Sequence, residues 1–397
     1  MEHCSAENTS RYTYLRYLRR VLVATILFVH FICRTRTGND GWIISENGNQ
    51  NNKEAASLFN RHWPEMKEQM CPDMSPNPNV WSALFELARM ELGFSEDRIK
   101  LNEADDNAVA DFFRFDTGGM GHVSHDNKHH MAYLTVWKGG NNQISSNLRS
   151  ILGGNGSVWS GYTMRDLFSA SRIPTSKLNL TCVVTAVRDP VEHFLSAYNE
   201  VEGRNSPEYM KKRSGKYRSW TNPLLFASYG NGTTARFEQF VSDFIGSPQR
   251  ADHYVLELHH VFSMTGVLWG LKQLKDCSGD KGPRLTAYLP SLSNLDTEFP
   301  KLLQRTCSGL PHLDSFVKKF VHPSQSDPYN TYSAARQVWG HHEGASRALC
   351  AIHALDYACF ESIPVPSLCQ SVFANQQFRD HLLYAAATGN KTTAACS

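Results

Sequence analysis

Apolar and polar positions along this chain predict short buried strands separated by helices. Two apolar runs, Met131–Trp137 and Cys182–Val187, have the length of buried strands. Apolar residues at helical spacing mark longer segments, which cover residues 79–94, 106–115, 144–152, 190–202, 234–246 and 343–360. Short strands that alternate with helices favour an α/β fold with a mainly parallel sheet flanked by helices.

The N-terminal part of the chain has a different pattern. An apolar run covers residues 21–33, and several arginines precede it. We expect a cytosolic tail at 1–20, an uncleaved signal anchor at 21–33, a polar stem or linker at 34–70 and a lumenal domain at 71–397. The run is short for a membrane span, so a cleaved signal peptide of a secreted protein and a buried helix are the alternatives.

Composition narrows the compartment and the partners. Lys and Arg total 40 against 38 Asp and Glu, and this net charge of +2 gives no support to a nucleic-acid partner. The cysteines beyond the anchor are even in number, which permits disulfides in an oxidising lumen, with buried free thiols as the alternative. Sites compatible with N-glycosylation occur at Asn155, Asn179, Asn231 and Asn390.

The first strand leads into a polar, glycine-containing segment that could open a helix. This segment consists of Lys138, Gly139, Gly140, Asn141, Asn142 and Gln143. Glycines let backbone N–H groups approach a ligand, and a helix start directs N–H groups and a positive dipole at the same point. With the lysine charge, they predict a cradle for a phosphate-like anion. A tight turn with a solvated lysine is the alternative.

The second strand ends at another cation. Arg188 follows the strand, Pro190 can begin the next helix, and Ser196 falls within that helix. An arginine can hold a phosphate through two parallel hydrogen bonds, and a serine can donate a third. Because ligands lie beyond the carboxyl ends of strands in α/β sheets, the two segments together suit a nucleotide with anions at both ends. An ion pair of Arg188 with Asp189, or a helix cap, is the alternative.

These two segments resemble the cofactor motifs of the carbohydrate sulfotransferases, Golgi membrane enzymes that use 3′-phosphoadenosine 5′-phosphosulfate (PAPS). Lys138 and Gly140 match the strand–K-x-G-x-T–helix loop of that family. The family's R-D-P-x-x-x-x-x-S-x-Y segment is matched by Arg188, Asp189, Pro190, Ser196 and Tyr198. The resemblance covers residues 130–310. This sequence departs from the family's first motif at two positions. Trp137 stands where the family often has proline, and Asn142 stands where Thr or Ser is usual.

The resemblance implies a P-loop-like sulfotransferase fold and PAPS as co-substrate, without a metal. Residues 138–143 would hold the 5′-phosphosulfate, and Arg188 with Ser196 would hold the 3′-phosphate. The reaction would transfer a sulfuryl group to a hydroxyl of a glycan or glycoconjugate in the Golgi lumen. Lys138 would stabilise charge on the departing phosphate.

The general base is not fixed by any motif. Asp166 and His253 are weak candidates, because Asp166 can equally cap a helix or pair with Arg165 and His253 can be a packed or surface histidine. Further titratable side chains near the second motif or downstream of it are Glu192, His193, His259 and His260.

Three other interpretations remain open. A histidine-rich segment at His122, His125, His129 and His130 has spacing that could hold a metal, although a solvated loop is the simpler interpretation. A P-loop-like kinase or other nucleotide-dependent transferase lacks support, because no G-K-[ST] sequence occurs in the loop. A non-catalytic lumenal domain that binds anionic sugars is the third.

Overall fold

The structure is a computed structural model of the full chain. It describes residues 47–101, 103–115, 118–170, 175–204, 230, 232–247, 258–278, 282–311, 313–314, 316, 327, 329–341 and 343–388. The chain divides into two compact units, residues 1–51 and 52–397. The tail and anchor expected at 1–33 lie outside the described residues. Within the described ranges, no helix combines the length and the apolar character needed to cross a membrane.

Five strands form one sheet in the order β3-β1-β2-β4-β5. Their bounds are β1 Gly119–Ser124, β2 His130–Leu134, β3 Gly156–Gly161, β4 Cys182–Ala186 and β5 Leu285–Leu289. β2, β4 and β5 run parallel, whereas β1 pairs antiparallel with both β2 and β3. The sheet is therefore mixed, and the prediction of a mainly parallel sheet is wrong. The reason is the five-residue connection from β1 to β2, which is too short for a parallel crossover.

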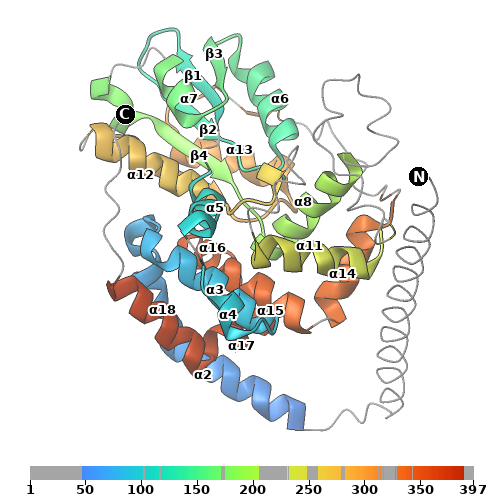
Figure 1. Cartoon of the computed structure of the whole chain (residues 1–397). Coiled ribbons are helices and arrows are strands. Elements are labelled where there is room, and N and C mark those ends of the chain that lie inside the picture. The colour runs from blue at the N-terminus through green and yellow to red at the C-terminus, as the bar shows by residue number, and fades with distance from the viewer. Residues whose placement is uncertain are drawn as a thin grey trace, which may run out of the picture. The chain divides into compact units, whose positions relative to one another are not determined.

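In Figure 1 the helices α6, α7, α12 and α13 lie near the sheet, whereas α2, α3, α4, α15, α17 and α18 group together below it. The bounds of the described helices are α2 Asn47–Met70, α3 Trp81–Glu91, α4 Glu96–Ile99, α5 Glu103–Arg114, α6 Asn141–Leu152, α7 Met164–Ala170, α8 Pro190–Arg204, α11 Thr234–Gly246, α12 Gly266–Ser278, α13 Leu295–Thr306, α14 Thr331–His341, α15 Glu343–Ile352, α16 Ala354–Cys359, α17 Ser367–Ala374 and α18 Gln376–Thr388. The helix predicted over 343–360 is divided at His353 into α15 and α16. The other predicted helices are confirmed, with ends shifted by a few residues.

The expected stem at 34–70 is in part a helix. Helix α2 carries Phe59, Trp63, Met66 and Met70 at helical spacing. Phe59, Met66 and Met70 are buried, and Trp63 stacks on Phe373 of α17 with ring centroids 5.0 Å apart. The many asparagines before this stripe masked its apolar periodicity.

The sheet has a hydrophobic cluster on each face. Met131 and Tyr133 of β2 face α6 and α13, whereas the alternate residues Ala132 and Leu134 belong to the larger cluster with α5, α8 and α12. All five residues of β2 are buried, as expected for a strand covered on both faces. The central strands are therefore fixed in position by packing, and the loops at their ends are held with them.

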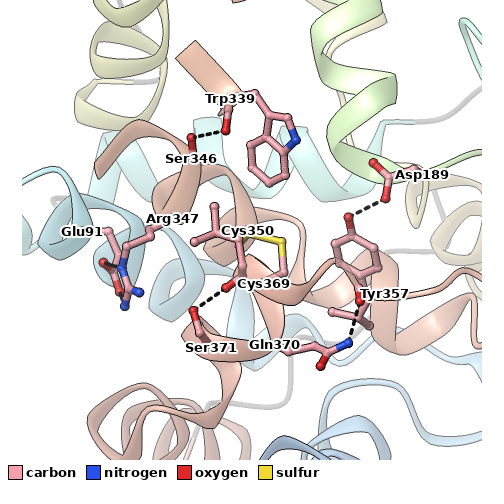
Figure 2. Close-up of a disulfide and its surroundings, with 12 residues drawn as sticks. Glu91, Asp189, Trp339, Ser346, Arg347, Cys350, Tyr357, Cys369, Gln370 and Ser371 are labelled. Carbon is pink, nitrogen blue, oxygen red and sulfur yellow. Dashed lines mark hydrogen bonds and ion pairs between the residues drawn. A yellow bond between two sulfur atoms is a disulfide. The ribbon is translucent and has the colours of Figure 1, made fainter. Parts of the chain in front are cut away.

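Disulfides and polar contacts join elements of the domain that are distant in sequence. The pairs are Cys71–Cys359, Cys182–Cys307 and Cys350–Cys369, which confirms the expectation of disulfides for these six cysteines. Figure 2 shows the bond between α15 and α17, and beside it the Tyr357 hydroxyl directed at Asp189 (2.8 Å). The start of α8 is therefore anchored to α16.

A buried ion pair holds the other end of α8. Glu202 of α8 and Arg236 of α11 are 3.1 Å apart, and neither side chain is exposed to solvent. Burial raises the pKa of Glu202, while Arg236 opposes that shift. This pair fixes the helix that carries Ser196 and Tyr198 of the second predicted motif.

We expect Arg236→Leu to lower the free energy of unfolding by about 3 to 5 kcal/mol, because it leaves the Glu202 carboxylate buried without its partner. Urea unfolding of the wild type and the variant measures this loss. The double variant Glu202→Leu/Arg236→Leu should recover part of it, since no charge is then buried. Equal losses in the single and double variants would contradict the assignment.

Candidate functional site

The two predicted motifs lie side by side at one edge of the sheet. β2 and β4 are adjacent parallel strands, with Leu134 opposite Thr185, and the Thr185 hydroxyl donates to the Leu134 carbonyl (2.8 Å). A Cβ atom on Gly139 would lie 2.8 Å from the carbonyl oxygen of Ala186, so only glycine fits this approach. The loop after β2 is therefore packed directly on the end of β4.

The loop after β2 turns through two left-handed residues into α6. Lys138 has φ 61° and Gly140 has φ 77°. Gly140 is the N-cap of α6, and its carbonyl accepts the first helical hydrogen bond from Ile144 (3.1 Å). A lysine in the left-handed region is strained. The turn thus holds the lysine at the positive end of a helix, as the sequence predicts.

His193 joins this loop to α8. Its Nε2 donates to the Trp137 carbonyl (2.6 Å), and the imidazole is buried. Burial, assisted by the neighbouring His353, lowers the pKa of His193 to about 3, so the ring is neutral at pH 7. His193 therefore acts as a fixed hydrogen-bond donor that positions the loop.

Lys138 pairs with a carboxylate of α8 that the sequence did not single out. Its Nζ lies 2.9 Å from Glu200, which also pairs with Arg204. Burial alone would raise the pKa of Glu200, but Lys138 and Arg204 outweigh burial and lower it to about 2. One carboxylate is thus shared by two cations.

Arg188 also shares a carboxylate with a second cation, at the opposite, N-terminal end of α8. Its guanidinium lies 3.7 Å from Glu192, and Arg336 of α14 pairs with the same carboxylate. The Tyr332 hydroxyl donates to Glu192 as well (2.8 Å). The N-terminus of α8 is capped by Asp189, whose carboxylate accepts the Glu192 backbone N–H (2.8 Å). Arg188 therefore does not serve as the cap.

Ser196 lies between these two groups along α8. Positions 192, 196 and 200 are one helical turn apart and all three are half-buried, while most residues between them are buried. The hydroxyl predicted to bind an anion therefore shares a helix face with both carboxylates. Glu200 pairs with two cations, and so does Glu192. These two groups therefore carry more positive than negative charge.

A histidine pair packs on Trp137 from the segment before α12. The ring of His259 lies 4.8 Å from that of Trp137, and His260 lies 5.2 Å from it. Burial, with Arg204 nearby, lowers the pKa of His259 to about 4. A neutral imidazole is thus held at pH 7 next to residues 138–143, the segment after β2 that we call the anion loop.

The two predicted bases have different outcomes. Asp166 is exposed and forms a capping box at the start of α7: its carboxylate accepts the Thr163 N–H (3.2 Å), and the Thr163 hydroxyl accepts the Asp166 N–H (3.0 Å). This contact gives Asp166 a structural role. His253 lies outside the described residues.

In the described part of the chain, no group of three or more His, Cys, Asp or Glu side chains is placed to hold a metal ion, and that part includes the four histidines at 122–130.

A cavity of about 530 Å³ opens beside the first turns of α6. Its wall comes from the end of β2, one face of α6, the start of β1 and the end of β3. Residues of the wall that bear on its chemistry are Trp137, Asn142, Ser145, Arg149, Ser160 and Tyr162. Lys138 and Arg188 do not line it. The cavity therefore extends from the anion loop away from β4.

Sequence reasoning missed Glu200, Arg204, Arg336 and the cavity. The first two had a signal, because Glu200 is one turn beyond Ser196 in the same helix and Arg204 one turn further. Arg336 had none, since it is distant in sequence and its helix reaches Glu192 only through the packing of α14 on α8.

Wild-type stability should fall more steeply with acid than that of His193→Gln, which keeps a side-chain donor. An unfolded histidine takes up a proton below about pH 6.5, whereas the buried ring stays neutral to about 3. The stability that the neutral ring supports is complete above pH 6.5 and is lost as the pH falls. Between pH 7 and 5 the wild type should lose about 2 kcal/mol more than the variant in urea unfolding. Parallel pH dependences would contradict this.

The arrangement can bind an anion with several negative charges: a lysine and a helix start after β2, an arginine and a serine after β4, and further arginines behind both.

No family model, no curated protein and no solved structure matches the chain.

Proposed function

We propose that this protein transfers a sulfuryl group from PAPS to a hydroxyl of a glycan or glycoconjugate. The observation that carries the proposal is the pairing of β2 with β4. Two adjacent parallel strands are each followed by a short loop that carries a cation and leads into a helix, and Gly139 of the first loop packs against the end of β4. A nucleotide with a phosphate at each end has the charge distribution that this edge complements.

The loop after β2 suits the 5′-phosphosulfate. The start of α6 presents backbone N–H groups at residues 141–143, and Lys138 adds a charge at the same point. Its pairing with Glu200 leaves Arg204 to neutralise that carboxylate when Lys138 turns to a ligand. Arg188 and Ser196 suit the 3′-phosphate in the same way, with Arg336 left to pair with Glu192.

The reaction is an in-line displacement at sulfur. The acceptor oxygen forms a bond to sulfur, the bond from sulfur to the 5′-phosphate oxygen breaks, and adenosine 3′,5′-bisphosphate leaves. Negative charge grows on that phosphate oxygen, where Lys138 and the helix N–H groups lower the barrier. The acceptor's proton must pass to a base.

We place His259 in that role. Its lowered pKa keeps the imidazole neutral and able to accept a proton, and it contacts Trp137 immediately before Lys138. Asp166 is the weaker candidate, because its carboxylate already caps α7.

The proposed setting is the Golgi lumen, with a type II membrane anchor in the N-terminal segment. Support comes from the three disulfides, which suit an oxidising compartment. The proposed partners are the membrane and the glycan acceptor, with no nucleic acid and no metal.

Binding of adenosine 3′,5′-bisphosphate, measured by calorimetry, tests the nucleotide site. Arg188→Ala and Lys138→Ala should each weaken binding about 10- to 100-fold, because a charge-assisted hydrogen bond contributes about 1.5 to 3 kcal/mol. Lys272→Ala is the matched control, since Lys272 is a partly exposed lysine paired with Asp276 (2.7 Å) on α12. Absence of binding by the wild type, or preference for ATP with magnesium, would rule out the proposal.

Transfer from radiolabelled PAPS to a panel of glycans tests the base. His259→Gln should lower kcat about 100-fold or more, the contribution of a positioned general base, while the affinity for adenosine 3′,5′-bisphosphate stays unchanged. Because the pKa of His259 is about 4, wild-type kcat should stay level from pH 7 to 5 and fall only in stronger acid. An unchanged kcat in the variant would remove His259 from this role.

A further inference from the structure

We infer that the cavity beside α6 is the acceptor subsite and that it selects an acidic sugar, one that carries a carboxylate or sulfate. This inference rests on the proposed sulfuryl transfer, because it supplies the acceptor of that reaction. It is supported by the set of residues that line the cavity. Of these, only Asn141 and Asn142 also belong to the proposed nucleotide site.

The cavity has the size and position of an acceptor site. Its volume of about 530 Å³ falls within the range of small-molecule sites, about 300–1,000 Å³. Trp137 and Asn142 both line it. Trp137 directly precedes Lys138, and Asn142 is part of the anion loop as the second residue of α6. A sugar held there would present a hydroxyl next to the start of α6, where the sulfuryl group is proposed to lie.

Aromatic side chains at the wall suit the C–H face of a sugar ring. Trp137 is 36% exposed and Tyr162 is 96% exposed. They are two of the four large apolar side chains that are exposed in the described part of the chain, and both line this cavity. Single exposed aromatic rings are common on protein surfaces, but rings grouped at a hollow are typical of a ligand-binding groove.

Polar groups on the wall suit the hydroxyl edge of the same ring. Asn142, Ser145 and Ser146 follow one face of α6, and Ser160 lies at the end of β3. Amides and hydroxyls both donate and accept hydrogen bonds, as sugar hydroxyls do. Stacking surfaces and bifunctional polar groups thus meet in one cavity.

Arg149 supplies the preference for a negative charge. Its guanidinium donates to the Ser160 hydroxyl (2.6 Å), and among the described residues it is paired with no carboxylate. The described wall of the cavity contains no Asp or Glu. Lys138, Arg188, Arg204 and Arg336 all have acidic partners, so Arg149 differs from them in having charge available for a ligand.

The test compares two defined probes on the full-length protein by calorimetry. A chondroitin sulfate tetrasaccharide carries carboxylates and sulfates, whereas cellotetraose is neutral. The wild type should bind the acidic probe more tightly. Arg149→Ala should weaken acidic binding about tenfold and leave cellotetraose unchanged, while Tyr162→Ala weakens both and Tyr162→Phe restores them. Exposed residues elsewhere, in Arg98→Ala of α4 and Tyr384→Ala of α18, are the matched controls.

Binding of adenosine 3′,5′-bisphosphate by the same variants separates this inference from the proposed function. Unchanged nucleotide affinity in Arg149→Ala and Tyr162→Ala, with acidic binding lost, supports the acceptor subsite. Loss of nucleotide binding in these variants overturns it, because the nucleotide would then occupy the cavity. Tetrasaccharide binding that is absent in the wild type, or equal in Arg149→Ala, also overturns it, even where the nucleotide binds. A wild type that binds the tetrasaccharide through Arg149 but no nucleotide refutes the sulfotransferase proposal instead, and with it the acceptor role.

Discussion

The parallel pairing of β2 with β4 is the constraint on which the candidate site depends. It brings the ends of both strands to one edge of the sheet, so that two loops distant in sequence become neighbours. The contact of Gly139 with the Ala186 carbonyl makes that approach close enough to exclude any side chain. Without it, Lys138 and Arg188 would be two unrelated surface cations.

Helix α8 converts this adjacency into a defined electrostatic arrangement. Glu192 and Glu200 each share a carboxylate between two cations, and Ser196 lies between them. These pairs hold long basic side chains in place, which would lower the entropy that binding of the proposed nucleotide must overcome. An anion that replaces Glu200 or Glu192 at one cation leaves the carboxylate with its second cation. The excess positive charge is therefore available without leaving an acidic group unpaired.

The position of α8 is in turn set by contacts outside the site. Asp189 caps the helix and accepts the Tyr357 hydroxyl, Glu202 pairs with Arg236, and His193 donates to the Trp137 carbonyl. Buried polar groups require partners, so each contact permits few alternative placements of the helix. The disulfide between Cys71 and Cys359 fixes α16, which carries Tyr357. The anion loop is thus linked to residues more than two hundred positions away.

Local pattern predicted the two central strands β2 and β4, fewer than half of the described helices (α3, α5, α6, α8, α11, α15 and α16) and the residues at the two strand ends, because periodicity, proline and glycine act over a few neighbours. The local pattern also indicated that Asp166 could cap a helix, because that contact joins residues only three positions apart. It did not give the antiparallel β1, whose glycines conceal a strand, nor the helix at Asn47–Met70 among its asparagines. Only the tertiary structure decided which carboxylates meet Lys138 and Arg188, that His259 lies on Trp137, and that a cavity opens beside α6. These depend on the packing of distant elements, which no local spacing encodes.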